Sequence, residues 1–133
     1  MLELTIKGEV YQFNFGMGFL RDINKKICTP VDGLKDVNKN IGLQDTVASV
    51  IDGDPEALVD LLEAANKGFS PRVSRNLLDS YIDDDETDID DLFKTVIDFL
   101  KSANATKKAV VAMLEEIEKE KRKREAKELA NQN

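Results

Sequence analysis

Carboxylates are the most concentrated chemical groups in this chain, and they gather at residues 83–91. That segment, DDDETDIDD, holds seven acidic side chains and no basic one. Clustered carboxylate oxygens suit Ca²⁺, which an EF-hand binds with a 12-residue loop of fixed spacing. Counted from Asp84, the sixth position is Ile89 and the twelfth is Thr95, where that loop requires glycine and glutamate. The spacing therefore argues against a calcium loop.

The acidic segment also suits the start of a helix. Thr87 followed by Asp90 resembles a capping box, and acidic side chains in a first turn favour the helix dipole. The alternative is a docking patch, in which Asp83, Asp84 and Asp85 bind a basic partner. A small acidic adaptor or regulator is therefore one hypothesis for the chain.

Other kinds of chemistry have few candidate residues. The chain has no histidine and one cysteine, Cys28, so the commonest general base and metal ligand is absent and no thiolate cluster can form. No nucleophile elbow, phosphate-binding glycine loop or paired-carboxylate signature is present. We therefore expect a protein that is not an enzyme and that binds no metal or cofactor.

The charge is distributed unevenly. Residues 115–128 hold six acidic and six basic side chains, with pairs such as Glu115 and Lys119 four residues apart, as on a solvated helix. Outside this run and residues 83–91 the two signs are equal in number, so the acidic segment carries the whole net charge of −7. Nucleic-acid binding, which needs a basic surface, is not expected. A nucleic-acid arm at residues 119–124 remains the competing hypothesis.

The elements that must position these residues begin with a β-hairpin at residues 2–15. Leu2, Leu4 and Ile6 alternate with polar residues, and Gly8 marks a turn. Tyr11, Phe13 and Phe15 then alternate in the same way. An isolated hairpin needs a cover over its apolar face. The helical spacing of Phe19, Leu20, Ile23 and Ile27 predicts that a helix supplies it.

The remainder of the chain is predicted to be mainly helical. Asp54 with Pro55, and Ser70 with Pro71, are typical of helix starts. Residues 29–33 suit a turn or a short helical start, while residues 34–40 fit either a helix or an irregular connection. The predicted fold class is α+β, mainly α, with the hairpin packed on about five to six helices. We expect one globular domain over residues 1–117 and a charged helical or frayed extension over residues 118–133, with a long charged C-terminal helix.

The opening residues 4–25, LTIKGEVYQFNFGMGFLRDINK, resemble the start of tail assembly chaperones from long-tailed, siphovirus-type bacteriophages of Gram-positive hosts. In that family a short hairpin ending in Phe-x-Phe-Gly continues into a helix. The likeness extends to Gly42 with Leu43, to GDPEAL at residues 53–58, and to the acidic lead into Leu92–Phe93 and Phe99–Leu100. It covers roughly residues 1–114 and does not include the tail from Glu118.

The resemblance implies a non-enzymatic protein that coats the helical tape-measure protein until the tail tube polymerises around it. It implies the tape-measure protein as partner, the tail tube protein as a further one, and a homo-oligomer. No signal peptide or membrane-spanning stretch is evident, so we expect the protein in the host cytoplasm and absent from the mature virion.

Three groups of residues are candidates for binding partners. The hairpin edge at Val10, Gln12 and Asn14 is predicted to mediate self-association or strand pairing, because open strand edges recruit partners. The acidic residues 83–85 are the candidate docking patch. The client is expected on an exposed part of the helix from Leu92 to Leu100, where the candidate residues are Leu92, Phe93, Val96, Phe99 and Leu100.

Overall fold

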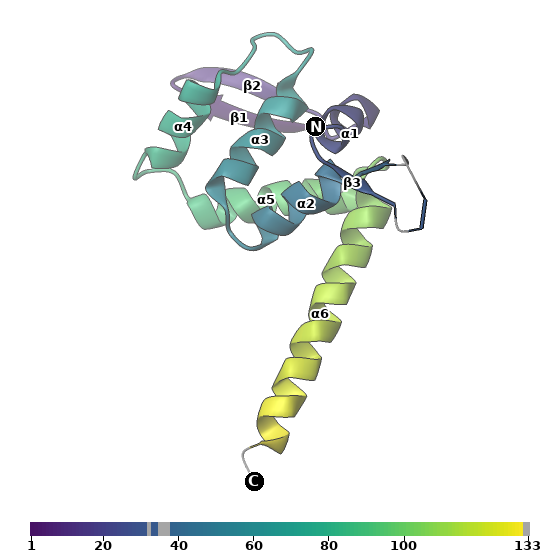
Figure 1. The fold of residues 1–133 in the computed structure, drawn as a ribbon. Coiled ribbons are helices and arrows are strands. Elements are labelled where there is room, and N and C mark those ends of the chain that lie inside the picture. The colour runs from purple at the N-terminus through teal and green to yellow at the C-terminus, as the bar shows by residue number, and fades with distance from the viewer. Residues whose placement is uncertain (32, 35–37, 132–133) are drawn as a thin grey trace.

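The computed structural model describes residues 1–31, 33–34 and 38–131, and Figure 1 shows a compact body from which one long helix projects. The described residues form six helices and two two-stranded antiparallel sheets, so the predicted mainly helical α+β class with an N-terminal hairpin is confirmed. In chain order the elements are β1 (Leu2–Ile6), β2 (Glu9–Phe13), α1 (Met17–Asn24), β3 (Cys28–Pro30), β4 (Asn38–Asn40), α2 (Gly42–Ile51), α3 (Pro55–Asn66), α4 (Arg75–Asp83), α5 (Ile89–Ser102) and α6 (Lys107–Ala130).

The N-terminal hairpin has the register expected for a two-residue turn. Leu2 lies opposite Phe13 and Ile6 lies opposite Glu9. Lys7 and Gly8 between them both have positive φ angles, of 51° and 80°, as in the type I′ turns whose twist matches that of the flanking strands. The predicted turn at Gly8 is confirmed.

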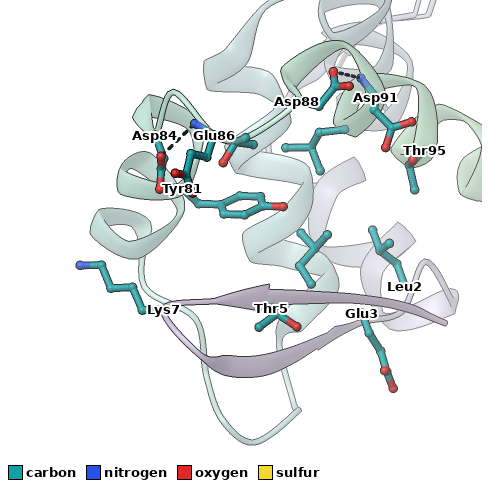
Figure 2. A pocket seen from close by; sticks show the side chains of 13 residues that line it. Leu2, Glu3, Thr5, Lys7, Tyr81, Asp84, Glu86, Asp88, Asp91 and Thr95 are labelled. Carbon is teal, nitrogen blue, oxygen red and sulfur yellow. Dashed lines mark hydrogen bonds between the residues drawn. The ribbon is translucent and has the colours of Figure 1, made fainter.

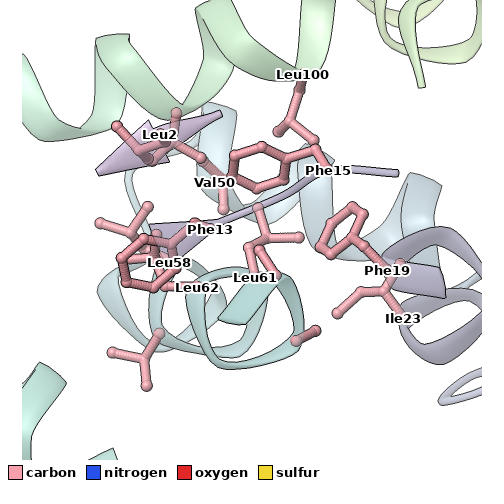
Figure 3. Close-up of a cluster of buried hydrophobic side chains, with 14 of the residues drawn as sticks. Leu2, Phe13, Phe15, Phe19, Ile23, Val50, Leu58, Leu61, Leu62 and Leu100 are labelled. Carbon is pink, nitrogen blue, oxygen red and sulfur yellow. The ribbon is translucent and has the colours of Figure 1, made fainter. Parts of the chain in front are cut away.

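The core lies between the hairpin and helices α1, α2, α3 and α5 (Figure 3). The rings of Phe15 and Phe19 meet edge to face with their centroids 5.1 Å apart. Leu58, Leu61 and Leu62 of α3 are fully buried, which makes α3 the central helix of the body. Burial of each large apolar side chain contributes about 1.5 to 3 kcal/mol.

Helices α1 and α2 meet at Gly42, where only a glycine fits. A Cβ atom at this position would collide with the carbonyl oxygen of Ile23. The Asn24 side chain accepts a hydrogen bond from the Leu43 backbone N–H at 3.3 Å, which fixes the start of α2 against the end of α1.

The second sheet was not predicted from the sequence. Cys28–Pro30 pairs with Asn38–Asn40, whereas residues 29–33 were expected to form a turn or a short helical start. Residue 32 of that stretch, and residues 35–37 of the ambiguous segment 34–40, lie outside the described residues. Pairing between short strands depends on tertiary context, so the local residue pattern does not reveal it.

Helix starts were predicted with mixed success. Asp54 caps α3 as expected, since its carboxylate accepts from the Glu56 N–H at 3.0 Å. The predicted start at Ser70–Pro71 is wrong, because Ser74 caps α4 instead and accepts from the Leu77 N–H at 3.1 Å. The cap of α5 is Asp88 rather than Thr87. Serines and acidic residues a few positions apart offer competing caps, and packing selects among them.

Helix α6 is one continuous helix that leaves the body (Figure 1). Its first turns are held by buried Val110 and by Thr106, whose hydroxyl donates to the Leu100 carbonyl at 2.6 Å. Every side chain from Glu115 to the end of the helix is exposed. The expected domain boundary after residue 117 therefore falls inside a continuous helix, three residues beyond the last half-buried position, Leu114.

Candidate protein-binding surfaces

The outer edge of β2 is partly covered by the end of α3. The Asn14 N–H donates to the Ala65 carbonyl at 2.9 Å, and the Gln12 carbonyl accepts from the Asn66 side chain at 2.9 Å. Of the three residues predicted for strand pairing at this edge, only Val10 makes no backbone hydrogen bond with α3 among the described residues; its side chain is 47% exposed. A partner strand along β2 would have to displace α3.

Asn66 holds this covered edge and was missed from the sequence. It is fully buried, and its amide donates to the carbonyls of Gln12 and Pro71 while its carbonyl oxygen accepts from the Val73 N–H at 2.7 Å and the Arg72 guanidinium at 2.9 Å. A buried amide is stable only when its groups are paired, as they are here. In the sequence, Asn66 stands near the end of a helix and shortly before Gly68, where an asparagine is usually exposed. The neighbouring residues therefore do not indicate that it is buried.

The outer edge of β1 is open. Ile6 and Glu9 flank the two-residue turn and form a hydrogen-bonded pair, so the backbone N–H and C=O groups of Glu3 and Thr5 point away from β2. Within the described part of the chain, these outward groups form no hydrogen bond with another residue. The hairpin thus has one covered and one open edge.

A groove of about 510 Å³ separates β1 from the connection between α4 and α5 (Figure 2). Its walls include five acidic side chains and one basic side chain. Two of the acids also organise the backbone: Asp84 accepts from the Glu86 N–H at 3.0 Å and Asp88 from the Asp91 N–H at 3.1 Å. The lining residues are Leu2, Glu3, Leu4, Thr5, Lys7, Tyr81, Asp84, Glu86, Thr87, Asp88, Asp91, Leu92 and Thr95.

The structure thus brings together two sequence features that lie some 80 residues apart, a hairpin edge and the acidic segment. Among the predicted docking residues only Asp84 lines this groove. Asp83 lies in a separate depression with Arg75 and Ile82, and Asp85 is exposed outside both. The acidic residues that line the groove are therefore Glu3 of β1 and, on the other side, Asp84, Glu86, Asp88 and Asp91.

The apolar stripe of α5 is divided between core and surface. Leu92, Val96 and Leu100 are 4%, 0% and 0% exposed, so they belong to the core and are not accessible to a partner on the folded body. Phe93 and Phe99 are half-buried. The Phe99 ring lies 6.3 Å from that of Phe15, which follows β2 in the chain.

A sequence model of the family described as phage tail assembly chaperone protein, TAC, matches residues 3–115 of the chain. The chain belongs to this family. No curated protein and no solved structure shows significant similarity to it. The family match ends where the side chains of α6 become fully exposed, so it spans the chaperone's packed body and leaves out the charged half of α6.

The chaperone has a second groove, at the junction of α5 and α6, that sequence reasoning missed. It measures about 390 Å³ and is lined by Lys101 of α5 and by residues of α6 that include Val111, Leu114 and Glu118. Val111 is 38% exposed, and Ile117, which is six residues further along and does not line the groove, is 41% exposed. Leu114 is half-buried against the core, whereas Ile117 is exposed because α6 extends beyond the body.

Other kinds of site are not evident in the part of the chaperone that the structure describes. Among those residues, no three His, Cys, Asp or Glu side chains are grouped so that they could hold a metal ion. No described helix is long and apolar enough to cross a membrane.

Proposed function

We propose that this chaperone binds the tape-measure protein and keeps it soluble until the tail tube polymerises. The match of the family model over residues 3–115 is the observation that carries the proposal. The tail tube protein is proposed as a further partner, and the phage as a siphovirus of a Gram-positive host. The role requires no catalysis, and the protein acts in the host cytoplasm and is left out of the mature virion.

The groove between α5 and α6 is the surface that suits a helical client best. Within the groove, Val111 exposes apolar area beside charged residues such as Lys101 and Glu118, and Ile117 exposes further apolar area on another face of α6. An amphipathic helix binds by laying its apolar face into a groove of this kind. On α5, the half-buried Phe93 and Ile97 stand two turns and one turn before Lys101 on the same helical face and extend this apolar surface.

Several copies would act together on one client. A tape-measure helix is much longer than a groove of this size, so covering it requires a row of chaperones, which we propose as a homo-oligomer on the client. Each copy adds a net charge of −7. Like charge on every copy keeps such an assembly soluble.

Co-expression with the tape-measure protein of the same genome, followed by size exclusion with light scattering, tests the function. The expected result is a soluble complex that contains several copies of the chaperone for each client chain. A client that precipitates equally with and without the folded chaperone would contradict the function and would favour the acidic adaptor instead.

A pair of variants tests the surface separately from the function. Val111→Glu with Ile117→Glu places charges in the α5–α6 groove and beside it and should abolish the soluble complex. Ala126→Glu with Leu129→Glu adds the same charge on the far end of α6, where Leu129 is 67% exposed, and should leave the complex intact. Equal solubility of the client with both double variants would move the binding surface elsewhere.

A further inference from the structure

We propose that the open edge of β1 binds an extended, basic peptide segment of a partner protein as an added strand. This site is distinct from the α5–α6 groove and from the docking of a client helix. It does not depend on the identity of the client, because it follows from the edge and the groove beside it.

Strand addition is the binding mode that the backbone of β1 allows. Glu3 and Thr5 present their N–H and C=O groups outward with no partner among the described residues, whereas at the outer edge of β2 the Gln12 carbonyl and the Asn14 N–H are hydrogen-bonded to α3. A strand that pairs with an open edge obtains its affinity from these main-chain hydrogen bonds. The β1 edge is therefore more available to a third strand than the β2 edge, part of which α3 occupies.

The groove beside this edge selects the charge of the added strand. Five acidic side chains and Lys7 line it, and Asp84, Glu86, Asp88 and Asp91 come from the opposite wall. Figure 2 shows these residues above β1, with the Tyr81 ring between the acidic turn and the strand. Alternate residues of an added strand point the same way, so lysines or arginines at every second position can face the acidic wall.

Two alternative occupants, a second copy of the chaperone and the basic part of its own α6, fit the groove less well. A second copy that paired β1 with β1 would bring two acidic walls together, and like charges at close range oppose association. The basic residues 119–124 of the chain itself lie within α6, which runs away from the hairpin (Figure 1). Charge and geometry therefore favour a basic segment from another protein.

Synthetic peptides test the proposal on the full-length chaperone by fluorescence anisotropy. The probe is a labelled peptide of about ten residues, a length typical of long strands, that alternates Lys and Thr. The same design with Glu in place of Lys tests charge. A version with prolines at two adjacent central positions, and with its charge restored by a terminal lysine, removes N–H donors from both peptide edges. Only the Lys/Thr peptide is expected to bind, and its affinity should fall in about 1 M NaCl, where screening is nearly complete.

Two pairs of chaperone variants locate the binding. Glu86→Gln with Asp91→Asn should lower the affinity for the Lys/Thr peptide about two- to thirty-fold, which is the range expected for the loss of two exposed ion pairs. Asp45→Asn with Glu56→Gln removes the same charge outside the groove and should leave affinity unchanged. Thr5→Pro removes an outward N–H of β1 and should weaken binding, whereas Thr5→Ala, which removes only the side chain beyond Cβ, should not.

Several outcomes would overturn the proposal, provided that circular dichroism shows each variant folded. Equal binding of the proline-containing peptide would show that charge alone attracts the probe and that no strand is added. Equal loss in both charge-neutralised variants would place the peptide elsewhere on an acidic surface. A change in oligomer mass with Thr5→Pro, without loss of peptide binding, would assign the β1 edge to a second copy.

Discussion

The two edges of the N-terminal hairpin differ in the folded chaperone: α3 binds the β2 edge, and the β1 edge is open. At β2, the end of α3 accepts from the Asn14 N–H and the buried Asn66 side chain donates to the Gln12 carbonyl. At β1, the outward groups of Glu3 and Thr5 face an acidic groove. The hairpin therefore attaches to α3 through β2 and keeps the edge of β1 unoccupied.

This contrast shows how a short sheet can be stable and still offer an edge. A two-stranded hairpin is marginal by itself and needs other elements to stabilise it. Covering both edges would leave no strand available to a partner, and covering neither would leave two edges prone to aggregation. One covered edge, together with the acidic side chains beside the other, restricts what can pair with the hairpin.

Removal of the side chain that covers the β2 edge should have the largest effect. Asn66→Ala leaves the Gln12 carbonyl and the Val73 N–H without their buried partner, which should lower the free energy of unfolding by about 2 to 4 kcal/mol. Urea denaturation measures this loss. Asn76→Ala, at an exposed position of α4, is the matched control and should change stability by less than about 0.5 kcal/mol. Similar losses in both variants would mean that the edge is not held by Asn66.

Proline substitutions at the two edges should lower the free energy of unfolding by less than Asn66→Ala does, and by different amounts at the two edges. Asn14→Pro removes the N–H that donates to Ala65 and should cost about 1 to 3 kcal/mol. Thr5→Pro removes an N–H that points away from β2, so it should cost less than Asn14→Pro. Denaturation midpoints measure both. Equal costs at the two positions would show that the β1 edge is also engaged within the fold.

The sequence was sufficient to predict the hairpin, its turn and the mainly helical class, because these features depend on local alternation and helical spacing. It was not sufficient to choose between the two edges of the hairpin. That choice depends on Asn66, which lies 54 residues from Gln12 and is recognisable only once α3 packs against β2. Self-association or strand pairing was accordingly predicted at the β2 edge, where α3 binds the Gln12 carbonyl and the Asn14 N–H.

The candidate surfaces were predicted less well than the fold for a related reason. Periodicity identifies the apolar face of a helix but does not show where the body that buries it ends. Leu92, Val96 and Leu100 lie in the core, whereas Ile117, which continues the apolar face of α6, is 41% exposed. The acidic segment is evident from the sequence, yet its position opposite β1 follows from tertiary packing alone.

Neutralising one acid of the open groove should have a still smaller effect. Glu86 lies among like charges, so Glu86→Gln should raise the free energy of unfolding by less than about 0.5 kcal/mol at low salt. Urea denaturation at low and high salt measures it, and high salt should remove the difference. Glu56→Gln, outside the groove, is the control. A gain that persists in high salt would contradict an electrostatic cause.

The smallest expected change in stability is confined to high pH. It should distinguish Tyr11 of β2 from Tyr81 of α4. Burial of its ring and the hydrogen bond from its hydroxyl to the Glu9 carboxylate, at 3.2 Å, raise the pKa of Tyr11 above its ordinary value. Because the folded state holds this proton more tightly than the unfolded chain does, the associated stability is complete below about pH 10 and is lost as the pH rises through the raised pKa. Urea denaturation across that range should show a decline that Tyr11→Phe diminishes. Tyr81→Phe, in the open groove, should retain the decline, and equal profiles for the two variants would contradict the assignment to Tyr11.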